Sequence, residues 1–179
     1  MQGTAEPAAK QRHSPHGRDF KIVGEPPLST TPLPLSAPRA RTLLALMDRI
    51  VPADEYGPSA SENAVDEFYA RILATDLADM LAAYEIGLDA IDAEARRRGG
   101  RAFADLAPEA QDALLEAVAA GDVATHWFIG PEWFFGRVVE HVSQGYYADP
   151  GNGANPDKAS WRMIGFPDRT GLETAEAAR

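Results

Sequence analysis

Apolar residues recur at intervals of three and four along five stretches of this sequence, and this spacing constrains the fold more than any other feature. An α-helix has about 3.6 residues per turn, so such spacing gathers the apolar side chains on one face. No stretch alternates apolar and polar residues as a half-buried strand does. We therefore expect an all-α fold, an irregular bundle of about five helices with an extended arm at each end.

Start and stop signals place these helices along the chain. A first helix begins after Ser36, has Pro38 in its first turn and ends at Pro52. The capping-box pattern Ser59-x-x-Glu62 predicts the start of a second helix. The other three helices are expected from about Asp76 to Gly99, from Pro108 to Ala120 and from Pro131 to Gly145.

The chain divides into a helical domain and two arms. Prolines crowd residues 1–36, and proline fixes φ and lacks a backbone donor, so this part is expected to be an extended arm or a disordered tail. Residues 37–147 form the helical domain. Residues 148–179 form a C-terminal arm that contains aromatic side chains.

Charge and composition exclude several classes of protein. The formal net charge of -10 argues against nucleic acid as a partner, because phosphates require a surface of Lys and Arg. The absence of cysteine excludes disulfides, thiolate metal sites and protein-ligated iron–sulfur clusters. No apolar run approaches the roughly 20 residues of a membrane span, so no direct membrane insertion is expected.

The stretch from Gly145 to Pro167 is the most unusual part of the sequence. It is rich in Gly, Asn, Asp and Pro, as a loop is, and it also carries several large aromatic and aliphatic residues. Long loops in compact domains are uncommon and are usually functional or disordered, and disordered segments are poor in aromatic residues. We expect these rings to be buried either against the domain itself or against another protein.

Four residues are candidates for acid, base or metal-binding roles. Adjacent Asp54 and Glu55 could supply an acid and a base, although such pairs in turn-rich loops are more often solvated or capping groups. His126 and His141 lack the spacing of a metal pair, and His126 beside two aromatic residues favours a packed or interface histidine. A free-standing enzyme that uses Asp54, Glu55 or His126 is one alternative function.

A calcium-dependent binding module is the other alternative. Oxygen-bearing side chains gather in the Gly-rich part of the C-terminal loop, at Asp149, Asn152, Asn155 and Asp157. Their spacing is not that of an EF-hand, and such residues also hydrogen-bond their own backbone in turns.

Two separated motifs resemble the gluconate 2-dehydrogenase subunit 3 family. Residues 48–60, DRIVPADEYGPSA, resemble its opening motif. The run GYYADP at 145–150, Asn155, and WRMIGFP at 161–167 resemble its closing motif. Two shorter patterns resemble the middle of the family, YEIGLDAI over residues 84–91 and FADL over residues 103–106. The resemblance covers roughly residues 40–167.

The resemblance implies a small, non-catalytic subunit of a periplasmic dehydrogenase complex. Its partner would be a large FAD-containing subunit of the glucose–methanol–choline type that oxidises a sugar, an aldonate or a polyol. A cytochrome c subunit would usually take the electrons onward. The small subunit would help the large one to fold and reach the periplasm. It would bind no cofactor itself, and the FAD and any iron–sulfur cluster or haem c would belong to the partners. Gluconate, glucose, a glycoside, fructose and sorbitol all stay open as substrates.

The sequence departs from the family in two places. The family usually reads Asp-Pro-x-Tyr-Gly-Gly-Asn, whereas Asp149-Pro150 is followed here by GNGAN, so the local turn must differ. Residues 17–22, GRDFKI, resemble only the second half of a twin-arginine export signal, and no apolar region follows. Either the partner carries the export signal or the start of this chain has been altered, and which subunit directs export stays open.

The aromatic residues of the last third and the closing motif are the expected partner interface. Catalytic, cofactor-binding and metal-binding residues are expected to be absent from this chain. The predicted interface residues are Trp127, Trp133, Tyr146, Tyr147, Asp149, Pro150, Asn155, Trp161, Ile164, Phe166 and Pro167.

Overall fold

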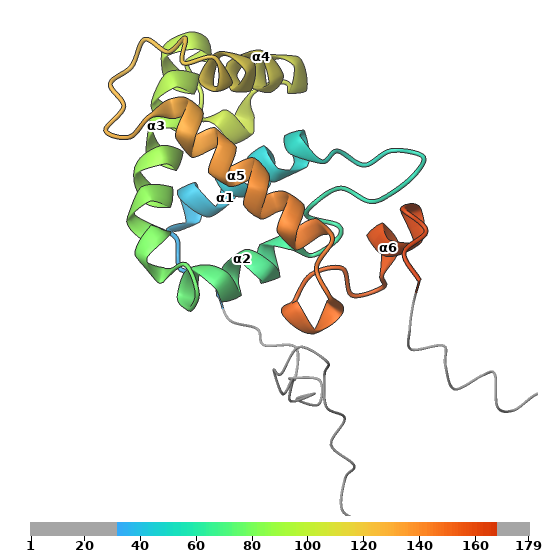
Figure 1. The fold of residues 1–179 in the computed structure, drawn as a ribbon. Helices are drawn as coiled ribbons and strands as arrows, with labels where there is room; N and C mark the ends of the chain where they lie inside the picture. The colour runs from blue at the N-terminus through green and yellow to red at the C-terminus, as the bar shows by residue number, and fades with distance from the viewer. Residues whose placement is uncertain (1–31, 168–179) are drawn as a thin grey trace, which may run out of the picture.

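The computed structural model describes residues 32–167 and confirms the all-α fold (Figure 1). No strand occurs within this range. The elements are α1 (Ala37–Ile50), α2 (Val65–Ala74), η1 (Ala78–Met80), α3 (Leu81–Gly99), η2 (Phe103–Asp105), α4 (Pro108–Ala119), α5 (Pro131–Tyr146), η3 (Pro150–Asn152) and α6 (Ala159–Met163), where η denotes a 3₁₀ turn. Most of the expected N-terminal arm, including the GRDFKI segment, and residues 168–179 lie outside the described part of the chain.

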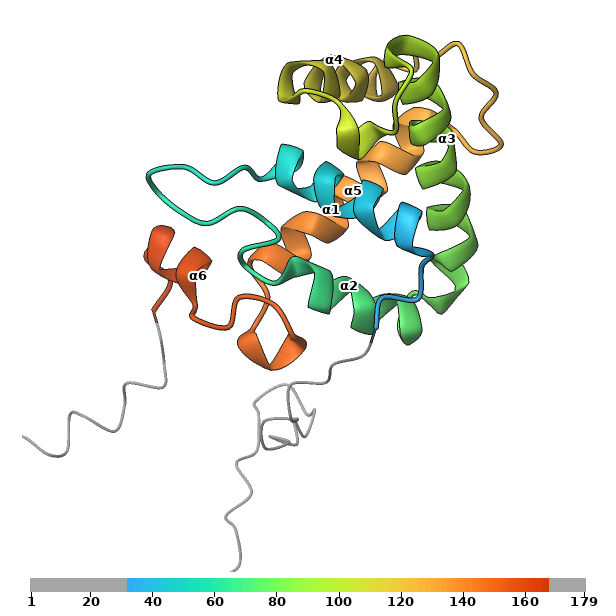
Figure 2. The ribbon, with the colours of Figure 1, turned by 180° about the vertical axis from the view of Figure 1, so that it is seen from behind.

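Helix α5 is the central element of the bundle. It packs against α1, α2, α3 and α4, and both views show it crossing the middle of the molecule (Figures 1 and 2). Its inner side chains Phe134, Val138 and Val142 are fully buried. They meet the buried stripes of α1 and α2, where Leu43 and Tyr69 have no exposed surface. The apolar spacing of the sequence therefore identifies the faces that form the core.

The close approach of α3 to α5 depends on a glycine. A Cβ atom built on Gly87 would lie 2.4 Å from the Phe134 ring, so no larger residue fits there without movement. The Phe134 ring also meets the Tyr84 ring edge-on at a centroid distance of 5.8 Å. The aromatic core and the small residue together set the spacing of these two helices.

A buried carboxylate joins three elements at one side of the core. The side chain of Asp92 on α3 accepts hydrogen bonds from Thr42 Oγ1 on α1 at 3.0 Å and from the Phe103 backbone N–H at 2.9 Å. Arg96 donates to its other oxygen at 3.0 Å. A buried carboxylate is tolerated because its oxygens are satisfied by donors in this way.

Two expected helix starts differ from the structure. The capping box forms, because the Ser59 N–H donates to Glu62 Oε2 at 2.9 Å and the Glu62 N–H donates to Ser59 Oγ at 3.3 Å. It closes only a turn, however, and α2 begins at Val65 after Ala64 adopts a left-handed φ of 56°. The third helix was expected from Asp76, but the 3₁₀ turn η1 comes first and α3 begins at Leu81.

The C-terminal stretch contains more secondary structure than a loop. The composition of this stretch is that of a loop, but the short elements η3 and α6 lie within it. The turn at the departure from the family pattern is η3, which Asp149 caps by accepting from the Gly151 N–H at 2.9 Å. The five longer helices otherwise match the sequence expectation closely, α4 and α5 to within one residue at each end.

Candidate functional site

Asn155 fixes the C-terminal arm to the helical body. Its side chain is fully buried, and its backbone has a left-handed φ of 54°, which asparagine tolerates better than most residues. Its N–H donates to the Asn63 carbonyl at 2.8 Å, and its Nδ2 donates to the Ala148 carbonyl at 3.1 Å. Its Oδ1 accepts from the Ser160 N–H at 3.2 Å, at the start of α6. Through its backbone and its side chain, this one residue joins the body, the segment just after α5 and the start of α6.

The long connection between α1 and α2 adds two more hydrogen-bonding residues to this junction. We call Asn63, Tyr146 and Asn155, with the backbone groups that they bind, the frame. Asn63 Nδ2 donates to the Tyr146 carbonyl at 2.9 Å. The Tyr146 hydroxyl donates to the Pro58 carbonyl at 2.8 Å. The two segments that carry the family resemblance, 48–60 and 145–167, therefore meet in space although they are far apart in the sequence, as Figures 1 and 2 show.

Large apolar side chains point to solvent from this frame. The exposed fractions are 72% for Tyr56, 43% for Tyr147, 38% for Met163, 54% for Ile164 and 51% for Phe166. We call these five residues the α6 surface. A Cβ atom built on Gly57 would lie 3.1 Å from Met163 Sδ, so the loop that carries Tyr56 packs directly on α6. Apolar residues gathered in this way are typical of an interaction surface.

Trp161 holds part of the α6 surface in place. Its Nε1 donates to the Tyr147 carbonyl at 3.0 Å, and its ring lies 4.9 Å from the Phe166 ring between centroids. The ammonium group of Lys158 lies 6.0 Å from the centroid of the same ring. The exposed rings are therefore supported by ordered neighbours, which lowers the entropy lost when a partner binds.

A second aromatic group lies at the other end of α5. Phe128 is 80% exposed and Trp133 is 49% exposed, whereas Trp127 is half-buried against Phe134 at a centroid distance of 6.4 Å. Figure 1 shows their loop beside the start of α5, away from α6. The aromatic residues predicted as one interface therefore belong to two separate surfaces.

Glu94 anchors the loop of this second group. Its carboxylate is fully buried on α3, yet it accepts hydrogen bonds from Arg97, Arg98 and the N–H of Thr125 at 2.7, 2.8 and 3.0 Å. Burial alone would raise the pKa of Glu94, but these donors together lower the pKa well below its usual range. The loop thus has a charged anchor in the helical body.

The structure divides the predicted interface residues into exposed and buried ones. Tyr146 and Asn155 are buried, so they build the frame and present no surface to a partner. Asp149 and Pro150 form the cap and first residue of η3. The partly or well exposed members of the predicted set are Trp127, Trp133, Tyr147, Asp149, Pro150, Trp161, Ile164, Phe166 and Pro167. Tyr56, Met163 and Phe128 were missed, although a large residue in a turn-rich loop is a signal for each.

The acid and base candidates have structural roles or lie apart from one another. Asp54 Oδ1 accepts from the N–H groups of Tyr56 and Gly57 at 2.8 and 3.0 Å, which shapes the loop, and Glu55 beside it is exposed. His141 is buried, with Nδ1 2.7 Å from the Tyr84 hydroxyl, and burial lowers its pKa. The His126 ring is exposed and lies against Phe128 at 4.5 Å.

Two side chains of the calcium candidate already make hydrogen bonds within the arm. Asp149 accepts from the Gly151 N–H and caps η3, and Asn155 Oδ1 accepts from the Ser160 N–H. The backbone carbonyl of Asn152 accepts from Arg71 Nε at 3.1 Å. Across residues 32–167, no group of three or more His, Cys, Asp or Glu side chains is arranged to hold a metal ion. No helix in that range is long and apolar enough to cross a membrane.

The fold and this site define a class of protein: an all-helical chain whose ordered arm presents exposed apolar rings, as interaction subunits do. Residues 37–167 match the family described as gluconate 2-dehydrogenase subunit 3. The chain therefore belongs to this family, as the two motifs indicated, and its family name describes a subunit of a multi-subunit dehydrogenase. No curated protein and no solved structure gives a significant match.

Proposed function

We propose that this chain is the small, non-catalytic subunit of a periplasmic FAD-dependent dehydrogenase that oxidises a sugar, an aldonate or a polyol. Its role is to stabilise the large flavoprotein subunit and to aid its folding or export. The FAD lies in that partner, which passes electrons to a cytochrome c, and any iron–sulfur cluster lies outside this chain as well. The α6 surface is the contact with the large subunit.

The single observation that supports this proposal most is the position of the α6 surface. Its apolar residues stand on a frame that the two family motifs build together, around Asn155 and Tyr146. Burying exposed Ile164 and Phe166 against a partner is favourable by about 25 cal/mol per Å² of apolar surface removed from water. Because Asn155 and Trp161 already order this surface, little of that gain is lost to ordering side chains on binding.

Co-purification of the complex tests the proposal. The full chain is tagged in its native cell, and the recovered material is assayed by visible spectrum, subunit masses and dye reduction with a panel of sugars and polyols. A yellow complex that reduces the dye with one of these substrates is the expected result. A colourless chain recovered alone would contradict the proposal.

A matched pair of variants tests the role of the α6 surface. Ile164→Ala removes an apolar side chain that is 54% exposed on this surface, whereas Ile86→Ala removes one that is 37% exposed on α3, away from α6. Truncating a residue that dominates an interface to alanine costs about 2 kcal/mol of binding free energy, or roughly a 30-fold loss of affinity. We expect that loss for Ile164→Ala alone. Equal recovery of flavin with both variants would exclude this surface as the contact.

A further inference from the structure

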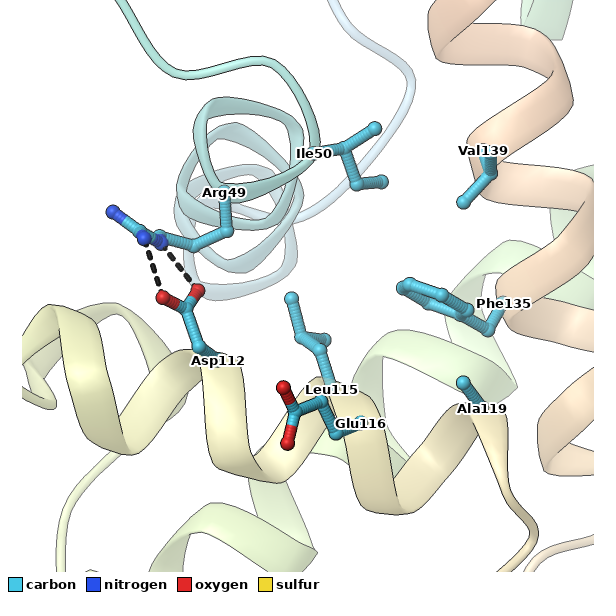
Figure 3. A pocket seen from close by; sticks show the side chains of 8 residues that line it. All are labelled: Arg49, Ile50, Asp112, Leu115, Glu116, Ala119, Phe135 and Val139. Carbon is cyan, nitrogen blue, oxygen red and sulfur yellow. Dashed lines mark hydrogen bonds and ion pairs between the residues drawn. The ribbon is translucent and has the colours of Figure 1, made fainter.

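An apolar groove on the helical body lies outside the α6 surface. It is formed by the C-terminal end of α1 and by the facing sides of α4 and α5 (Figure 3). Its volume is about 350 Å³. None of the five residues of the α6 surface lines it. The apolar residues that line it are Ile50, Leu115, Ala119, Phe135 and Val139.

Of the three charged side chains at the groove, one carboxylate has no opposite charge beside it among residues 32–167. Arg49 Nε and Nη2 donate to the two oxygens of Asp112 at 2.7 and 2.5 Å, so this pair neutralises itself. The ion pair raises the pKa of Arg49 and lowers the pKa of Asp112, so both groups stay charged over the physiological range. The third charged residue, Glu116, is exposed on the same wall, as Figure 3 shows. The groove therefore complements an apolar body with a positive charge beside it.

The walls of the groove select the backbone conformation of an occupant. The N–H and C=O groups of α4 and α5 are mostly used within the helices, so they offer an extended strand no row of partners. An α-helix satisfies its own backbone and binds such grooves through side chains alone.

We propose that this groove receives an amphipathic α-helix of the flavoprotein partner. A large apolar side chain of that helix lies between Leu115 and Phe135, and a Lys or Arg lies beside Glu116. The net charge of -10 on the whole chain favours the same basic partner at longer range. This inference rests on the proposed function, and it adds a second contact and the chemistry of the segment that makes it.

Filling the groove tests the contact. Ala119 and Ala113 are both exposed on α4, but only Ala119 lines the groove. Ala119→Phe should lower the affinity of the purified flavoprotein for this chain about tenfold or more, whereas Ala113→Phe should leave it unchanged. Circular dichroism and melting temperature check that both variants are folded. Equal affinity of the two folded variants would overturn the proposal.

Charge reversal tests the basic group. Glu116→Lys at the groove should weaken binding several-fold, and the loss should shrink as salt is raised. Asp79→Lys, at an exposed acid on η1, should have a smaller effect, because that residue does not line the groove. An equal loss for both variants would show that only the net charge matters and would overturn the assignment of Glu116.

Crosslinking identifies the occupant. The chain has no cysteine, so Ala120→Cys, one residue beyond Ala119, provides a single thiol for benzophenone maleimide. After reconstitution with the flavoprotein and irradiation, mass spectrometry should find an adduct with a flavoprotein peptide that carries apolar residues at helical spacing and a Lys or Arg. Adducts confined to a second copy of this chain, or to its own residues 1–31, would overturn the proposal, as would the absence of any adduct.

Failure of this inference differs from failure of the proposed function. If the wild-type chain brings down no flavoprotein, the proposed function is wrong. If the complex forms, Ile164→Ala weakens it and Ala119→Phe matches Ala113→Phe, then only the groove contact is wrong.

Discussion

At the scale of single residues, two buried polar side chains carry much of the order around the exposed aromatic groups. Asn155 uses its backbone N–H and both ends of its amide to join the arm to the body. Glu94 uses one carboxylate to join α3 to the loop before α5. Each is fully buried, so loss of its partners would leave polar groups without hydrogen bonds.

We predict that Asn155→Ala destabilises the chain by about 2 kcal/mol, because it leaves buried backbone groups unpaired and strains a left-handed residue. Asn155→Gly should recover part of this loss, since glycine adopts the positive φ of 54° without strain. Denaturant unfolding measures the difference, and Asn152→Ala, at an exposed position in the same loop, is the control. An Asn155→Ala variant as stable as the control would contradict the role of this side chain.

The stability contributed by Glu94 should depend on pH. Its folded-state pKa lies below the unfolded value of 4.5, so its contribution is present above that value and is lost as pH falls below it. Glu94→Gln should therefore lose on the order of 2 kcal/mol at pH 7 and less at pH 3. Urea unfolding at both pH values measures this change. An equal loss at both values would show that the charge of Glu94 contributes nothing.

At the scale of elements, the helix packing around α5 depends on where small residues stand. Gly87 on α3 lies against Phe134, where a Cβ atom would be 2.4 Å from the ring. Gly136 is also inside a helix, but a Cβ atom there would meet nothing. Glycine inside a helix is less favourable than alanine. Close packing against Phe134 therefore requires glycine at position 87, whereas nothing requires it at position 136.

The same substitution at these two glycines should therefore have opposite effects. Gly87→Ala should destabilise the chain by about 1–3 kcal/mol through overpacking against the ring. Gly136→Ala should stabilise it by about 0.5–1 kcal/mol through helix propensity. Thermal or denaturant unfolding measures both. Destabilisation by Gly136→Ala would contradict the open surroundings of this position.

At the scale of the whole molecule, the α6 surface and the groove are built from different residues of one helical body. The α6 surface is built at the C-terminal end of α5, and the groove lies between α5, α4 and the end of α1. No residue of the α6 surface lines the groove, and effects at independent sites usually add.

If both surfaces bind the same flavoprotein, the losses from Ile164→Ala and Ala119→Phe should add in free energy within about 0.5 kcal/mol. The binding affinities of the two single variants and the double variant form the cycle that measures this. A double variant no weaker than the worse single one would show that the two surfaces do not contact the partner at the same time.

Two neighbouring tyrosines show which part of the interface the sequence could not predict. Tyr146 and Tyr147 were both expected at the interface, and sequence pattern gives no reason to separate them. In the structure Tyr146 is 2% exposed and Tyr147 is 43% exposed. Consecutive residues of a helix differ by about 100° in direction, so at its end one points to the core and the next points away. Only the packing of α5 decides which one does so.

By itself the sequence determined the helical class, the approximate bounds of the five longer helices and the family, because these depend on local spacing and on residues within single segments. It did not determine that segments 48–60 and 145–167 meet, that the aromatic residues divide into two groups, or that Ile50, Leu115 and Phe135 share a groove. Those features require helices distant in sequence to pack against one another, and side-chain shape across the whole core decides that packing.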